Sequence, residues 1–178
     1  MKTADELDLN PAKTDLHGAS KTPGRPSEDG ADNGEDRAMP TRELNFGIPD
    51  LTLEWSCGGT VNPSGFAGHQ LVVLFLPLGK REAAAELASY EGCAHEFANF
   101  DTWFLPIAQE TLEGSSHRSP IAVDPADGAW SRFVKLAELD HERTAGGAFL
   151  FTHGGTLQRA WPGQGHATAV LGELNTRA

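Results

Sequence analysis

The chain has 178 residues and a formal net charge of −11, because 25 Asp and Glu residues outnumber 14 Lys and Arg residues. A protein that neutralises phosphates needs a basic face, and no Lys/Arg cluster occurs here, so composition argues against nucleic acid as the main partner. No apolar run reaches the roughly 18 residues that a membrane span needs, and the acidic start lacks the apolar stretch of a secretory signal. We therefore expect a soluble, cytoplasmic protein with one domain of ordinary size and no membrane contact.

The first 44 residues differ in composition from the rest of the chain. They contain ten acidic and six basic residues and almost no aromatic ones. Such a segment cannot bury enough apolar area to offset the conformational entropy lost on ordering. The sequence therefore predicts a disordered acidic tail over residues 1–44 and a folded domain over residues 45–178.

The first half of the domain reads as two strand regions followed by a helix. Residues 48–55 alternate apolar with polar side chains, which indicates a half-buried strand, and residues 57–60 have turn chemistry. Leu71–Leu76 is a run of six apolar residues, which predicts a strand buried on both faces. A helix is expected over residues 81–97, with one buried face spaced by three and four residues: Leu87, Tyr90, Ala94 and Phe97.

The second half alternates strands with helices and closes on a hairpin and a helix. Pro106 in the next strand indicates a strand end or an irregularity. The expected elements are strands over 103–108 and 121–123, a turn over 124–128, a helix through 130–136, a hairpin of 148–152 with 156–161, and a helix over 167–175. This order describes an α/β sheet covered by helices on both faces.

The most informative place is where the buried strand delivers the chain to a helix N-terminus. Amide dipoles at such a point favour a thiolate or another anion. Ala83 and Ala84 occupy it here. Lys80 and Arg81 could bind a small anion, with Glu82 partly cancelling them, but a solvated helix start is the preferred interpretation.

The candidate metal ligands and nucleophiles are few. Cys57 and Cys93 are too few for a disulfide framework, or for a zinc site without other ligands, so both are expected to be free thiols. No pair of histidines shows ligand spacing on one helix face, and we predict no metal and no cofactor. The seven histidines are His17, His69, His95, His117, His141, His153 and His166.

Four stretches at consistent spacing resemble the peroxiredoxin-like redoxins (the alkyl hydroperoxide reductase/thiol-specific antioxidant, AhpC/TSA, family). They are Gly47–Gly68, Leu71–Pro77, Pro120–Phe133 and Ala148–Trp161, and together they reach from about residue 46 to 174. The resemblance implies a thioredoxin-like fold: a central mixed sheet with helices on both faces, in its peroxiredoxin-like version with an N-terminal β-hairpin. It also implies antioxidant oxidoreductase activity.

The resemblance also implies where the chemistry would sit. The family's reactive cysteine follows the pattern P-x-x-x-[T/S]-x-x-C. Pro77 matches the proline, the hydroxyl position falls on Lys80 or Arg81, and the cysteine position falls on Ala83 or Ala84. A cysteine peroxidase attacks peroxide with a thiolate, which alanine cannot supply.

The arginine that the family places just before the late strand falls on Gly146 or Gly147. Cysteine, hydroxyl and arginine are therefore all absent from the matched positions. The resemblance thus implies a degenerate active site.

Three functions remain open at this point. The first is a binding or regulatory module with an unidentified protein partner, and a homodimer is open because family members dimerise through more than one surface. The second is a thiol-dependent oxidoreductase that uses Cys93, with Cys57 as resolving partner, although Cys93 lies roughly 14–15 Å along the helix from the alanines. The third, ranked last, is a non-redox enzyme whose pocket holds Lys80, Arg81 or Glu82.

Overall fold

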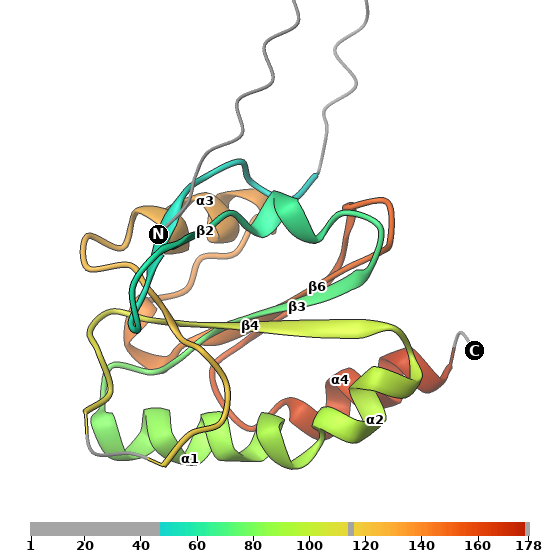
Figure 1. Cartoon of the computed structure of the whole chain (residues 1–178). Helices are drawn as coiled ribbons and strands as arrows, with labels where there is room; N and C mark the ends of the chain where they lie inside the picture. The colour runs from blue at the N-terminus through green and yellow to red at the C-terminus, as the bar shows by residue number, and fades with distance from the viewer. Residues whose placement is uncertain (1–46, 114–115, 177–178) are drawn as a thin grey trace, which may run out of the picture. The chain divides into compact units, whose positions relative to one another are not determined.

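The computed structural model describes residues 47–113 and 116–176 (Figure 1). The tail predicted over residues 1–44 lies outside these residues, so it stays a prediction. Within the described ranges the chain forms one mixed sheet with helices on both of its faces, as the sequence predicted.

The sheet has seven strands in the order β2-β1-β5-β4-β3-β6-β7. β3 pairs with β4, and β4 with β5, in parallel, while the other four pairings are antiparallel. The strands are β1 (Leu53–Trp55), β2 (Thr60–Val61), β3 (Gln70–Phe75), β4 (Thr102–Ala108), β5 (Ala122–Val123), β6 (Gly147–Phe151) and β7 (Leu157–Pro162).

Helices α1 (Lys80–Gly92), α2 (Ala94–Asn99) and α4 (Ala167–Asn175) cover one face of the sheet, and α3 (Gly128–Leu136) covers the other (Figure 1). Two short 3₁₀ helices, η1 (Pro63–Phe66) and η2 (Arg143–Ala145), lead into β3 and β6.

From Leu71 onward, the central strand β3 is continuously apolar because it is buried on both faces. Residues 71–76 are all at most 1% exposed. Alternate side chains enter opposite cores, so that Val72 and Leu74 face α1 and α4, while Val73 and Phe75 face α3. A strand covered on both faces has no position for a polar residue, which is what the run from Leu71 to Leu76 indicated.

The helix predicted over residues 81–97 is wrong in one respect, because it consists of two helices that break at Cys93. The backbone of Cys93 has φ −98° and ψ 6°, and its N–H donates to the carbonyl of Tyr90 at 3.0 Å. Gly92, a poor helix former, precedes the break. Phe97 is buried as expected, but Ala94 is exposed, because α2 turns away from the axis of α1.

Candidate functional site

The junction between β3 and α1 is built as the sequence indicated. Pro77 is buried, Gly79 caps the start of α1, and the N–H of Ala83 donates to the carbonyl of Gly79 at 2.7 Å. Ala83 is 1% exposed and Ala84 is partly exposed, so the two alanines lie in and just after the first turn of the helix. That turn presents neither a thiol nor a hydroxyl.

The N-terminus of α1 is covered by the helix's own carboxylate. A Cβ atom placed on Gly79 would collide with the carboxylate of Glu82, which therefore folds back over the cap residue. Because this carboxylate lies where the helix dipole favours negative charge, it opposes the binding of an external anion. Glu82 is thus a local stabiliser of the helix start.

The other polar residues predicted at the junction lie at the surface. The ammonium of Lys80 is 3.4 Å from a carboxylate oxygen of Glu110, and both side chains are more than 60% exposed. Arg81 is exposed as well. Of the predicted pocket residues, Pro77 does line a hollow, together with Leu78 and Glu110, but its volume of about 10 Å³ holds no more than about one water molecule.

A buried arginine that the sequence reasoning missed lies against the end of β3. The guanidinium of Arg143 donates to the carbonyl of Leu76, and the side chain is only 7% exposed. Its Cζ atom lies 5.4 Å from the ring centroid of Phe75 and 5.6 Å from that of Trp130. The matched positions Gly146 and Gly147 carry no guanidinium, but Arg143 brings one to the junction from a different position.

The sequence reasoning missed Arg143 because of the spacing between this arginine and β6. The resemblance placed the position at Gly146 or Gly147, directly before the strand, whereas Arg143 stands in η2. Gly146 has φ 72°, and a Cβ there would collide with the carbonyl oxygen of Phe75, so only glycine permits this close approach. The available signal was that Arg143 is the only Lys or Arg between residues 136 and 158.

Two carboxylates compensate the buried charge of Arg143. Its Nε lies 3.4 Å from Oδ1 of Asp127, whose other oxygen accepts a hydrogen bond from Gln109 at 3.0 Å. Burial lowers the pKa of Arg143, and Asp127 and Asp124 act against this effect. The guanidinium nevertheless stays charged, because arginine keeps its proton in proteins.

Asp124 has a second role at the start of α3. Its carboxylate accepts the backbone N–H groups of Gly128, Ala129 and Trp130 at 2.9–3.1 Å. These are the unpaired donors of a helix N-terminus, so Asp124 caps α3. The cap fixes Trp130 beside the guanidinium of Arg143.

Neither sulfur belongs to the first turn of α1. Cys57 is exposed in the turn between β1 and β2, and Cys93 is half-buried at the C-terminal end of α1; both are free. Burial, and then the charge of Glu96, raise the pKa of the Cys93 thiol. A raised pKa lowers the thiolate fraction at neutral pH, and the negative end of the helix dipole acts in the same direction.

Within residues 47–113 and 116–176, no group of three or more His, Cys, Asp or Glu side chains is arranged to hold a metal ion. His69 and His153 both approach the carboxylate of Asp101, at 2.9 and 3.6 Å, at the start of β4. No helix in these ranges has the length and apolar character to cross a membrane.

No family model and no curated protein matches the chain. Solved structures do match it. Peroxiredoxin Q of Xanthomonas campestris superimposes with a TM-score of 0.63 at 20% identity, over 72% of this chain and 92% of that one. Peroxidoxin BcpB of Mycobacterium tuberculosis gives 0.61 at 14% identity, over 74% and 96%. The pneumococcal exposed lipoprotein thioredoxin Etrx1 of Streptococcus pneumoniae gives 0.53 at 18% identity, over 72% and 99%.

These identities establish the fold alone. The chain has the thioredoxin-like fold in the form seen in peroxiredoxin Q proteins, which confirms the fold that the sequence resemblance implied.

Proposed function

We propose that this chain is a degenerate member of the peroxiredoxin-like redoxins that works as a binding or regulatory module. The observation that carries the proposal is the first turn of α1. Ala83 and Ala84 stand there in place of a nucleophile, and the carboxylate of Glu82 covers the end of the helix.

Peroxide reduction by a cysteine peroxidase requires a thiolate close to a positive site that stabilises the departing oxygen. The buried guanidinium of Arg143 could still supply positive charge, but the junction has no thiol for it to act on. Cys93 lies at the other end of α1, where burial raises its pKa. The positive charge of Arg143 and the thiol of Cys93 therefore lie at different ends of α1, too far apart to act on one peroxide.

The test is consumption of hydrogen peroxide and of an organic hydroperoxide by the full chain, with a dithiol as reductant. Wild type and the Cys57→Ser/Cys93→Ser double variant are expected to consume peroxide at the same rate as the dithiol alone. Turnover well above that background, abolished by Cys93→Ser, would overturn the proposal and favour the thiol oxidoreductase. Turnover that survives removal of both sulfurs would point to a non-thiol enzyme instead.

A further inference from the structure

A second hollow, larger than the one at Pro77, lies at the start of β4. It has a volume of about 520 Å³, which falls in the range of ligand-binding pockets. Its wall is mostly apolar and includes Trp55, Phe66 and Phe104. Trp103 also lines it and is 54% exposed, which is unusual for so large an aromatic side chain.

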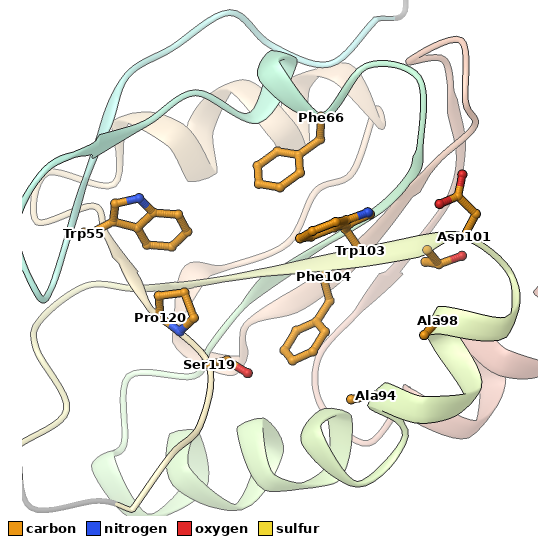
Figure 2. A pocket seen from close by; sticks show the side chains of 10 residues that line it. Trp55, Phe66, Ala94, Ala98, Asp101, Trp103, Phe104, Ser119 and Pro120 are labelled. Atoms are coloured by element: carbon orange, nitrogen blue, oxygen red, sulfur yellow. The ribbon is translucent and has the colours of Figure 1, made fainter.

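The pocket abuts a strand edge that lacks a partner within the described residues. β5 pairs with β4 only at Ile107 and Ala108, so the first half of β4 has no described strand on that side. The chain that precedes β5 leaves the sheet at Ser119 and Pro120, and the pocket fills the wedge between this departing segment and β4 (Figure 2).

The hydrogen-bond pattern shows which backbone groups face this wedge. The carbonyls of Asp101 and Ile107 accept from β3, whereas that of Ala108 accepts from Asp124 on the β5 side. Because backbone direction alternates along a strand, Thr102 and Phe104 turn their N–H and C=O groups toward the pocket. The edge therefore offers two donors and two acceptors.

Pro106 agrees with this alternation. It is a buried residue within β4, which corrects the expectation that it marks a strand end or an irregularity. Its position has the same parity as Thr102 and Phe104, so its missing N–H falls on the outer side of β4 and costs no bond to β3.

The pocket reaches both faces of the sheet edge. Figure 2 shows Trp103 and Phe104 pointing to opposite sides of β4, with Phe66 on the side of Trp103 and Ala94 on the side of Phe104. A strand added to this edge would alternate its own side chains between the two sides. Consecutive side chains of that strand would therefore contact apolar residues on one side of β4 and then on the other.

Charge at the pocket favours a basic partner. Asp101 is the only charged residue in its wall, and its carboxylate is more than half exposed even with His69 and His153 at 2.9 and 3.6 Å from it. The chain as a whole carries a net charge of −11. A Lys or Arg at the Asp101 end of an added strand is complementary to this carboxylate and to the negative charge of the chain. An acidic residue there is repelled.

We infer that the free edge of β4, Thr102–Leu105, and the adjoining pocket bind an extended peptide segment of another protein by strand addition. The segment carries consecutive apolar residues for the two sides of the pocket and a Lys or Arg beside Asp101. Main-chain pairing holds such a peptide, and the side-chain pockets select it. This inference gives the proposed binding module its kind of partner, but peptide affinity and peroxide turnover are separate measurements, so either can fail alone.

The test is selection of a phage-displayed random heptapeptide library on the full chain. Enriched peptides are expected to combine two or more consecutive apolar residues with a neighbouring Lys or Arg. A synthetic copy of the most enriched peptide is then compared with its backbone N-methylated form, which cannot donate to the carbonyls of Thr102 and Phe104. The N-methylated form should bind at least about tenfold more weakly.

Matched variants locate the site. Ala98→Trp places a ring in the pocket from α2 and should weaken binding at least about tenfold. Ala88→Trp, on the exposed side of α1, is the control and should leave affinity unchanged. Asp101→Asn, which tolerates the local φ of 51°, should weaken a Lys-bearing peptide but not its Gln analogue.

Several results would overturn the inference. They are failure of any peptide family to enrich, equal affinity of the plain and N-methylated peptides, and equal loss in Ala98→Trp and Ala88→Trp. A concentration-dependent dimer that Ala98→Trp dissociates would assign the edge to a second copy of the chain instead.

Discussion

Arg143→Met is the sharpest test of how the junction is held together. Methionine keeps much of the aliphatic volume beside Phe75 and Trp130 but removes the guanidinium. The variant loses a charged hydrogen bond to the carbonyl of Leu76, worth about 1.5–3 kcal/mol, and cation–π contacts worth about 0.5–1 kcal/mol. It also leaves Asp127 without its cation.

Together these losses predict a destabilisation of about 3 kcal/mol, or a fall in Tm of roughly 10 °C for a chain of this size. Urea unfolding followed by circular dichroism measures it. The control is Arg132→Met: the Arg132 guanidinium also donates to a carbonyl, that of Asp50 at 2.9 Å, but it is exposed. This control should stay within about 0.5 kcal/mol of wild type.

A double-mutant cycle then isolates the ion pair. Asp127 has φ 52°, which asparagine adopts readily, and Asp127→Asn can still accept from Gln109. The cost of the double variant Arg143→Met/Asp127→Asn should fall short of the sum of the single costs by about 1 kcal/mol. If Arg143→Met costs no more than Arg132→Met, or if the two changes simply add, the buried guanidinium does not hold the junction and the reasoning fails.

Three further predictions concern α1. Burial raises the pKa of Glu91, but hydrogen bonds from the backbone of residues 118–119 outweigh it and leave the pKa lowered. The charged Glu91 therefore stabilises the fold above about pH 4.5, and this stabilisation is lost as the pH falls through the lowered pKa. Glu91→Gln should thus lower the free energy of unfolding at neutral pH but not at strongly acid pH, and equal losses at both would contradict this. Ala84→Cys should react with iodoacetamide at a lower pH than Cys93, because the two thiols lie near opposite ends of one helix dipole; the reverse order refutes it. Tyr90→Phe should leave Tm unchanged or raise it, because the buried hydroxyl has no hydrogen-bond partner among the described residues; a clear loss of Tm would reveal one.

Periodicity was sufficient to predict most of the sheet and the helix faces. The run Leu71–Leu76 identified the central strand because burial on both faces leaves no room for polar residues. Gly92 was the one local signal of the break at Cys93, but the apolar spacing from Leu87 to Phe97 continues through it and predicted a single helix. The change of axis is set by packing against the sheet, which a one-dimensional pattern does not encode.

The parts of the candidate site that could be predicted are those whose place depends on a single helix or strand. Ala83 and Ala84 could be assigned because the first turn of a helix after a buried strand is local information. Arg143 could not, because its role depends on how far η2 lies from β6 and on Gly146 passing close to Phe75. The pocket at Thr102 exists because β5 pairs with only the last two residues of β4. The spacing of residues in the sequence does not predict the length of this pairing.

Ala83 and Arg143 differ in the packing that each supports at the junction. Ala83 is 1% exposed, and its N–H completes the first turn of α1 by donating to the carbonyl of Gly79. Arg143 donates to the carbonyl of Leu76 and lies over two aromatic rings, so its removal costs both a hydrogen bond and packing. Removal of the Arg143 side chain is therefore expected to weaken the fold, whereas Ala83 contributes only its methyl group and its backbone there. The buried guanidinium thus has a role in stability that depends on no catalytic step, and the cost of Arg143→Met measures that role.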